Sequence, residues 1–456
     1  MATTKISELN PLLSSDIAGN DVLPIVDTDG NETKKASITA LQIPLVSTGI
    51  GNCVEAVQTN STCTQIVFGG KNNCIDASGS ATTNTNPVGT APPVINTCSG
   101  YNFIGVGHSN KITGSFSSYD NLYANASNTI LGGTCNKIAQ IGTLSDYKLY
   151  YYMLIAGGNI IGGGASNRIE TLSGNYTPGG NIIGGGLENQ IYLTGSASGK
   201  YLQQNIIGGG YQNCIIGDGQ SVQFNTISGG YCHVIETTGG TQSSLYNIIA
   251  GGGFNNKISA GAGSSGILAG QFNQICGGQS SVILGGDCHM VSHSIWSSIA
   301  SGCENLIYGG SYNGIISGRK NCIIRTNPED SVGYNVIGGG CRNKIQNSQC
   351  SMIAAGYQNL ISGSGCFVGN DQNFIGGGCN NKIFSIKSSI LGGENNTILG
   401  THNRSFIIGQ GITSRRADAL HVNNLLLETG SIPTSDPGVP GMLYIAGGAL
   451  KVSGCL

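Results

Sequence analysis

The chain has 456 residues, of which 75 are glycine, and its 21 basic and 23 acidic residues give a formal net charge of −2. Only 10% of the residues are charged and 39% are hydrophobic, which excludes an intrinsically disordered chain; the glycines also lack the three-residue period of collagen. Lysine and arginine form no cluster denser than a pair, which argues against a nucleic-acid partner.

The first 46 residues predict a small β-rich module. A strand at Val22–Val26 and a second at 34–39 flank a polar segment that contains Asp29 and Gly30. This segment lacks the ligand order and the terminal glutamate of an EF-hand loop, so we expect a hairpin turn there and no calcium site.

A repeat dominates the chain beyond this module. Residues 47–100 contain a first coil and an insertion rich in Pro, Thr and Asn, and residues 101–411 repeat the pattern Asn-x-Ile-x-Gly-Gly-x-x-Asn-x-Ile. Residues 128–138 (NTILGGTCNKI) and 225–235 (NTISGGYCHVI) are two examples. A fixed period of this kind predicts stacked identical units.

The second Asn of the pattern gives the length of one coil. Asn273, His289, Asn305 and Asn321 follow one another every 16 residues, and longer intervals earlier in the chain predict additional loops at a turn. Sixteen residues hold two short strands, each followed by a turn that glycine permits through positive φ. The sequence therefore predicts an all-β parallel β-roll or β-solenoid. We expect these four residues to form a structural ladder whose side chains bond to the neighbouring coils.

So thin a coil encloses only two or three aliphatic side chains, which is little buried surface for the area it exposes. We therefore expect the roll to pack against further copies around an axis, and the non-repeat segments at both ends to cap it.

The 16 cysteines form no C-x-x-C pattern, which argues against a disulfide framework and a metal site. Cys232-His233 and Cys288-His289 resemble ligand pairs, but each His replaces the Asn of the repeat. We interpret the thiols that follow the glycines as small buried filler in a column, and we expect no metal and no other cofactor. They are Cys135, Cys232, Cys288, Cys303, Cys341 and Cys379.

Receptor contact is expected where the repeat is interrupted, because function on a rigid scaffold concentrates in loops. The longest insertion carries an aromatic cluster, and Trp296 is the only tryptophan. Stacked aromatic rings beside Asn and Ser hold sugar rings; the alternative is packing against a neighbouring subunit. The candidate residues in the insertion are Tyr147, Tyr150, Tyr151 and Tyr152.

For catalysis, glycan hydrolysis needs two carboxylates about 5 to 10 Å apart. Asp287 and Glu304 fall on neighbouring coils, but they occupy different positions after the glycines. Glu329 and Asp330 follow a proline and predict a solvated turn. We expect no catalytic residue, and a glycan-degrading fibre (depolymerase) remains an alternative.

The Ile-x-Gly-Gly-x-x-Asn-x-Ile spacing between about residues 66 and 411 resembles the head repeat of trimeric autotransporter adhesins. The resemblance implies a left-handed parallel β-roll that assembles as a homotrimer. The chain departs from those adhesins because it has no apolar leader behind a basic head, no heptad stalk and no stretch of about 18 apolar residues. A bacterial surface adhesin of the β-roll type is kept as a second alternative.

Both ends resemble another group of proteins. Residues 4–42, which open with Lys-Ile-Ser-Glu-Leu, look like the small N-terminal module of tailed-phage fibre and tail proteins. Residues 420–453 are similar to terminal modules of phage structural proteins, with Pro-Thr-Ser-Asp-Pro-Gly-Val before a short strand pair. The resemblance implies that residues 1–46 attach to the virion and that residues 412–456 form a capping or tip module.

Together these features predict a virion fibre or appendage, made in the host cytoplasm, that mediates attachment to the host surface without catalysis. Its expected partners are two further copies of itself, other virion proteins through residues 1–46, and a host cell-surface glycan. Nucleic acid and membrane insertion are not expected.

Overall fold

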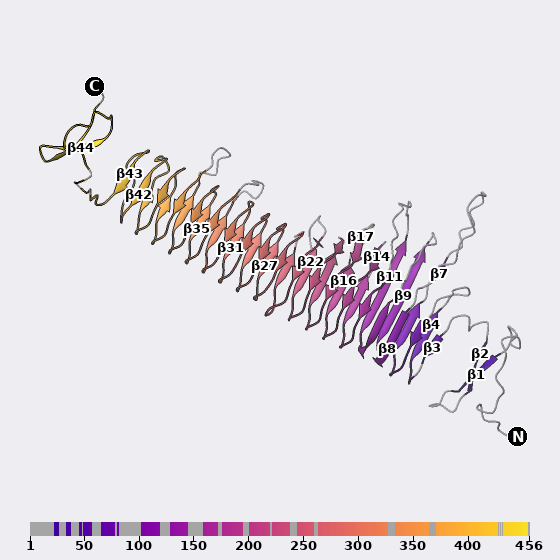
Figure 1. The fold of residues 1–456 in the computed structure, drawn as a ribbon. Coiled ribbons are helices and arrows are strands. Elements are labelled where there is room, and N and C mark those ends of the chain that lie inside the picture. The colour runs from indigo at the N-terminus through magenta and orange to yellow at the C-terminus, as the bar shows by residue number, and fades with distance from the viewer. Residues whose placement is uncertain are drawn as a thin grey trace, which may run out of the picture. The chain divides into compact units, whose positions relative to one another are not determined.

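The computed structural model describes residues 22–26, 33–37, 45–47, 49–56, 65–77, 80–81, 102–118, 128–144, 158–171, 176–194, 200–218, 221–237, 244–259, 263–326, 333–363, 371–426, 428, 430 and 432–454. These residues form short strands joined by turns (Figure 1), and none of them belongs to an α-helix that could span a membrane. The chain comprises two compact units, Met1–Tyr334 and Asn335–Leu456, which are described separately.

One row of strands, here called row A, precedes the glycine turns. In the first unit row A consists of β3 (Leu45–Ser47), β5 (Gln65–Val67), β8 (Asn102–His108), β10 (Thr129–Thr134), β12 (Ile160–Ile161), β15 (Ile182–Ile183), β18 (Ile206–Ile207), β21 (Thr226–Ile227), β24 (Ile248–Ile249), β26 (Gly266–Ile267), β28 (Val282–Ile283), β30 (Ser298–Ile299) and β32 (Gly314–Ile315). In the second unit it consists of β34 (Val336–Ile337), β36 (Met352–Ile353), β38 (Phe374–Ile375), β40 (Ser389–Ile390), β42 (Phe406–Ile408) and β43 (Leu420–Val422).

A second row, row B, follows the glycine turns. In the first unit it consists of β4 (Cys53–Ala56), β6 (Cys74–Ala77), β7 (Ser80–Ala81), β9 (Lys111–Ser118), β11 (Lys137–Leu144), β13 (Arg168–Thr171), β16 (Gln190–Thr194), β19 (Cys214–Asp218), β22 (Val234–Thr237), β25 (Lys257–Ser259), β27 (Gln274–Cys276), β29 (Met290–Ser292), β31 (Leu306–Tyr308) and β33 (Cys322–Ile324). In the second unit it consists of β35 (Lys344–Gln346), β37 (Leu360–Ser362), β39 (Lys382–Ile383) and β41 (Thr397–Ile398).

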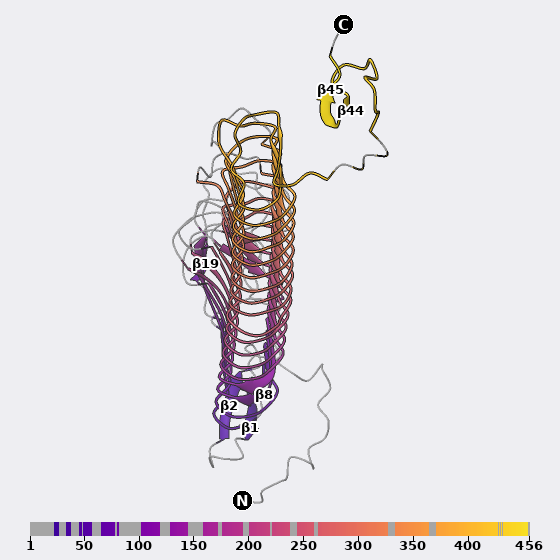
Figure 2. The ribbon, with the colours of Figure 1, turned by 90° about the vertical axis from the view of Figure 1, so that its left-hand side faces the viewer.

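The strands of each row pair in parallel, one coil above the next, so that the coils appear as stacked loops (Figure 2). In row A, Gly266 pairs with Val282, and Val282 pairs with Ser298. In row B, Gln274 pairs with Met290, and Met290 pairs with Leu306. Each step advances the chain by the expected 16 residues, which confirms the prediction of an all-β parallel solenoid.

The core is a double column of aliphatic side chains, one from each row. Ile267, Ile283 and Ile299 of row A are fully buried, as are Ile275 and Ile307 of row B. Because residues alternate in and out along a strand, the neighbours of each isoleucine point outward. Full burial of one such side chain contributes about 1.5–3 kcal/mol, and with so few per coil stability depends on the stacking of many coils.

The longer coils of the first unit contain a third row of parallel strands. It consists of β14 (Tyr176–Gly179), β17 (Lys200–Gln203), β20 (Val222–Gln223) and β23 (Ser244–Leu245), and two of its strands are labelled in Figure 1. The expectation that all additional residues form loops is therefore wrong for these coils. Rows A and B hold successive coils one strand spacing apart. The additional residues of one coil therefore lie beside those of the next coil and pair with them as parallel strands.

Each turn after row A requires a glycine. At Gly302 φ is +106°, and a Cβ built there would lie 2.0 Å from the Gly318 carbonyl oxygen of the next coil. Positive φ is not confined to glycine, however. Glu304, directly before Asn305, and Trp296, directly before Ser297, have φ of 56° and 50°. Their amides donate to carbonyls of the preceding coil, Glu304 to Asp287 and Trp296 to Gln279, both at 2.9 Å, which offsets the cost of this conformation.

Antiparallel strand pairs lie near both ends of the chain. In the first unit β1 (Val22–Val26) pairs with β2 (Thr33–Ser37), and in the second unit β44 (Leu443–Ala446) pairs with β45 (Ala449–Val452). The expected Asp29-Gly30 turn lies outside the described residues. Glu329 and Asp330 also lie outside them.

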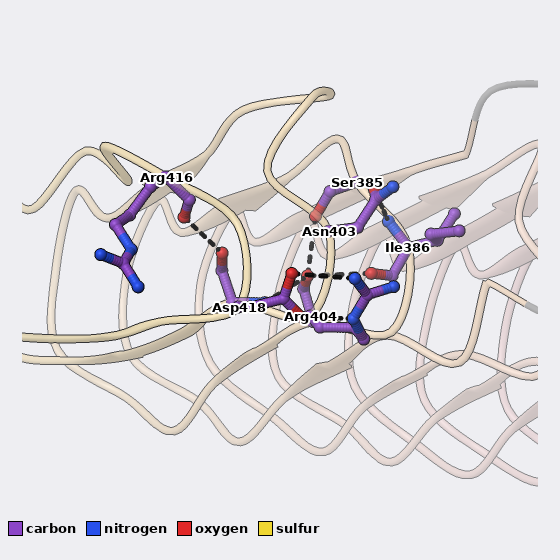
Figure 3. Close-up of polar contacts among 8 residues, drawn as sticks. Ser385, Ile386, Asn403, Arg404, Arg416 and Asp418 are labelled. Carbon is purple, nitrogen blue, oxygen red and sulfur yellow. Dashed lines mark hydrogen bonds and ion pairs between the residues drawn. The ribbon is translucent and has the colours of Figure 1, made fainter. Parts of the chain in front are cut away.

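The last coils of the second unit are joined by polar contacts (Figure 3). The Arg404 guanidinium bonds to both carboxylate oxygens of Asp418, with an Nη2 to Oδ2 distance of 2.8 Å, and this bond lowers the pKa of Asp418. The Asp418 amide donates to the Asn403 carbonyl at 3.0 Å, and the Ser405 hydroxyl donates to the Arg416 carbonyl at 3.0 Å. Stacking of coils thus continues to β43.

Candidate binding surfaces

The four residues expected to form a ladder lie in one column in consecutive coils. The amide of His289 donates to Oδ1 of Asn273 at 3.0 Å, the amide of Asn305 to Nδ1 of His289 at 3.1 Å, and the amide of Asn321 to Oδ1 of Asn305 at 2.9 Å. All four residues are buried. The side chains of Asn273, His289 and Asn305 thus each accept from the amide of the next coil.

The amide nitrogens of this column complete the turns. Nδ2 of Asn305 donates to the Ser301 carbonyl of its own coil at 3.2 Å and to the Gly318 carbonyl of the next coil at 2.9 Å. One side chain therefore bonds to three backbone groups, of which the Gly318 carbonyl also accepts the Cys303 amide at 3.0 Å. With these contacts made, the side chain holds the coils together and leaves little capacity for a ligand.

A second column lies at the other turn and contains Ser as well as Asn. The amide of Ser281 donates to Oγ of Ser265, that of Ser297 to Oγ of Ser281, and that of Asn313 to Oγ of Ser297, at 3.3, 3.3 and 3.1 Å. A hydroxyl thus replaces the carboxamide oxygen at this turn.

Two buried histidines, His233 and His289, occupy positions of the first column. Nδ1 of His233 accepts the Asn256 amide at 3.2 Å, as Nδ1 of His289 accepts that of Asn305. An accepting Nδ1 requires the neutral ring with its proton on Nε2. Burial lowers the pKa of both rings; for His289 the charge of Asp287 and the Gly302 carbonyl oppose the shift.

These histidines predict a loss of stability in mild acid. Because their folded pKa lies below the unfolded value of about 6.5, the unfolded chain binds more protons as the pH falls through that value. The free energy of unfolding should then fall by up to about 1.4 kcal/mol per pH unit for each ring. Thermal melts between pH 7.5 and 5 should show this fall, and the double variant His233→Asn/His289→Asn should remove most of it. The exposed His108→Asn is the control, and equal pH profiles for the double variant and the original chain would contradict the assignment.

The expected column of buried thiols is wrong. Cys135 and Cys288 are exposed, and the other four thiols are partly exposed, because these positions lie on the outside of the turn: Cys232, Cys303, Cys341 and Cys379. Cys53 and Cys74, which pair in register on β4 and β6, form a disulfide between coils. Burial raises the pKa of Cys214 to about 12, so this thiol stays protonated and unreactive.

Trp296 lies at the exposed end of a stack of three aromatic rings. Its ring is 4.9 Å from that of Tyr312, which is 4.7 Å from that of Tyr334, centroid to centroid. The Trp296 side chain is 54% exposed. The cluster Tyr147, Tyr150, Tyr151 and Tyr152 lies outside the described residues.

Further exposed aromatic residues were missed in the sequence. Phe224 and Tyr246 stack at 4.7 Å, and they occupy the same turn position as Trp296, directly before the first Asn or Ser of the repeat. A search of the sequence for aromatic residues at this shared position would have identified them. At the opposite turn a second cluster connects four rings: Tyr211, Tyr231, Phe254 and Phe272.

The outward positions of row A carry no charge. Ile248, Leu284 and Ile316 are 47%, 48% and 57% exposed. In the first unit, the residues that flank the buried isoleucines from β8 to β32 are Phe103, Gly105, Thr129, Leu131, Ile160, Gly162, Ile182, Gly184, Ile206, Gly208, Thr226, Ser228, Ile248, Ala250, Gly266, Leu268, Val282, Leu284, Ser298, Ala300, Gly314 and Ile316. Most of these positions are apolar or glycine, so this uncharged surface is a candidate interaction site.

Row B differs in this respect. Its outward positions in the first unit include Lys111, Lys137, Arg168, Glu170, Glu236 and Lys257. The Glu170 carboxylate is buried and pairs with Arg168 and, at 3.1 Å, with Nζ of Lys137. Burial and the charge of Arg168 lower the pKa of Lys137. Of the two rows in the first unit, row B therefore carries the charged side chains.

One of the two carboxylates considered for catalysis, Glu304, pairs with two cationic side chains. The Lys320 ammonium, 3.1 Å from the Glu304 carboxylate, lowers the pKa of that carboxyl, and the charge of Arg319 adds to the effect. A general acid in glycan hydrolysis needs the opposite shift. The lowered pKa of Glu304 fits the second carboxylate of such a pair, the base or nucleophile, better than the acid.

Among the described residues, no group of three or more His, Cys, Asp or Glu side chains could hold a metal ion. No protein-family model matches the chain, and no curated protein matches it at a significant level.

Proposed function

We propose that this chain is a structural fibre or appendage protein of a tailed-phage virion that mediates attachment to the host surface without catalysis. The solenoid is a spacer, residues 1–46 attach to the virion, and the exposed turns contact the host. Support comes from the parallel solenoid itself and from the phage-like sequences at both ends.

A fibre of this kind needs a thicker shaft than a single solenoid, and the uncharged outer face of row A carries this part of the proposal. Covering this uncharged face removes no charged group from water, whereas covering row B would remove the hydration of its lysines. The side chains of this face repeat from one coil to the next at the spacing of paired strands, here called one rung, which is about 4.8 Å. Only a partner with the same rung spacing can match them along many coils, and the partner that meets this condition is a second copy of the chain. We propose a left-handed homotrimer with the row A faces on the inside.

Charges placed on this face should dissociate the assembly. In the double variant Leu268→Lys/Leu284→Lys, two ammonium groups from each copy would have to be buried, and trimers should become monomers. Light scattering after size exclusion should give three times the 46.7-kDa chain mass for the original protein and one chain mass for the variant. Both leucines are exposed, 45% and 48%, so the coil itself should tolerate the change.

The matched control places the same charges on row B, as Gln274→Lys/Met290→Lys. This variant should remain trimeric, and circular dichroism should give the same β signal for all three proteins. A monomeric original protein, or dissociation by the row B variant alone, would overturn the proposed packing.

A further inference from the structure

The turn position occupied by Trp296 forms a column along the first unit, and two serines interrupt its aromatic residues. From Phe224 to Tyr312 the column contains, in chain order, Phe224, Tyr246, Ser264, Ser280, Trp296 and Tyr312. Each amide donates to the carbonyl just before the previous member: Ser264 to Leu245 and Ser280 to Gly263 at 2.8 Å, and Trp296 to Gln279 at 2.9 Å. These bonds fix the members on consecutive rungs.

The two serines are small, so the column has a notch between Tyr246 and Trp296. One aromatic face is open at each end of this notch. Tyr246 stacks on Phe224 with an interplanar angle of 6°, and Trp296 stacks on Tyr312 with an angle of 24°. The other face of each ring lies toward the serines, which are too small to cover it. Tyr246 is 56% and Trp296 54% exposed. Three rung spacings separate the two rings, about 14 Å.

The surroundings of the notch are polar but uncharged. The turn segments 263–265, 276–281 and 292–297 contain no Asp, Glu, Lys or Arg. Ser264 is exposed and Ser280 is half-buried, so hydroxyl groups form the floor. The ring of the nearby His293 is engaged by the Ser292 hydroxyl at 2.8 Å and by the ring of Tyr308.

We propose that this notch binds a neutral glycan. The C–H face of a pyranose ring packs against an open aromatic face, and its hydroxyl groups match the serine hydroxyls and turn backbone on the floor. One sugar ring fits against Trp296 and another against Tyr246. An anionic glycan would find no cation here to offset its desolvation. The inference rests on the proposed attachment function, because it names the ligand class of that surface.

Trp296 is the only tryptophan of the chain, so its fluorescence reports directly on this notch. Titration of the full-length protein with cellohexaose, chitohexaose and maltohexaose should shift or quench the emission with saturation for at least one of them. Sulfated dextran should cause no such change. The absence of a saturable change with all three neutral hexasaccharides would overturn the proposal.

A filled notch provides the matched variant. Ser280→Tyr should extend the aromatic stack over the open face of Trp296, and tyrosine is already tolerated in this column at Tyr246 and Tyr312, where φ is 58°. The dissociation constant should rise at least about tenfold, the loss of one stacking contact. Tyr231→Ser, at the opposite turn, should leave it unchanged. Equal affinity for Ser280→Tyr and the original protein would place the sugar elsewhere.

Labelling of bacterial cells separates this inference from the attachment function. If the fluorescent protein labels a panel of cells and Ser280→Tyr labels them equally, the notch proposal fails while attachment stands. If the original protein labels no cell of the panel but the hexasaccharides bind, the notch stands and the attachment function fails.

Discussion

Replacement of Gly186 by alanine should destabilise the solenoid by about 3 kcal/mol or more, whereas alanine at the adjacent Gly185 should change stability by less than about 1 kcal/mol. At Gly186 φ is +88°, and a built Cβ would lie 2.1 Å from the Gly210 carbonyl oxygen and 2.7 Å from Nδ2 of Asn189. That carbonyl also accepts the Leu187 amide at 2.9 Å and Nδ2 of Asn189 at 3.0 Å. Relief of the overlap therefore breaks two bonds between coils. A Cβ at Gly185 would meet nothing within 4 Å.

Local measurements suit this comparison better than a single melting curve, because unfolding in a repeat protein can be confined to neighbouring coils. Hydrogen exchange of peptides from residues 182–213 should be much faster in Gly186→Ala, with a smaller effect several coils away. The Gly185→Ala variant should retain the original protection. Equal protection in both variants would contradict the requirement for a glycine at this turn.

The coil was predictable because its dimensions are fixed by a few residues that recur in register. The 16-residue interval of the Asn273 column gave the coil length, and the Ile-x-Gly-Gly pattern gave two strands and a turn. The third row was not predictable, since Tyr176–Gly179 and Lys200–Gln203 share no motif and pair only because the two other rows place them one rung apart.

The candidate sites were predictable only in part, for a related reason. Trp296 was noticed as a single residue, but its partner Tyr312 lies 16 residues away and becomes a neighbour only once the register is known. The cysteines were misplaced because the sequence does not show which side of the turn faces solvent. Positive φ at Cys135, Cys232 and Cys288 turns these side chains outward, and the ladder residue that follows each is directed into the core. The other three cysteines, Cys303, Cys341 and Cys379, lie one position earlier in the turn and are also partly exposed.

The second large effect is expected at Asn189, where aspartate replaces one amide group by a carboxylate oxygen. Oδ1 of Asn189 accepts the Asn213 amide at 3.0 Å, and Nδ2 donates to the carbonyls of Gly185 and Gly210 at 2.9 and 3.0 Å. Asn189 is fully buried. In Asn189→Asp a carboxylate would face two carbonyl oxygens without a donor, and the variant should lose about 3–5 kcal/mol at pH 7.

The pH dependence distinguishes this mechanism from simple loss of packing. Burial and the facing carbonyls raise the folded-state pKa of the new carboxyl above its unfolded value of about 3.9. The folded chain then binds the additional proton more readily, so the deficit of Asn189→Asp relative to Asn189 should shrink as the pH falls from 7 toward 4. Asn189→Ala, which cannot titrate, should show a deficit independent of pH.

Two further variants complete the argument. Asn255→Asp makes the same chemical change at an exposed residue of the same unit and should change stability by less than about 0.5 kcal/mol. Asn189→His should be milder than Asn189→Asp, because His233 occupies the same column two rungs away and accepts the next amide through Nδ1. If the deficit of Asn189→Asp were as large at pH 4 as at pH 7, buried charge could not be its cause, and the column would act through shape alone.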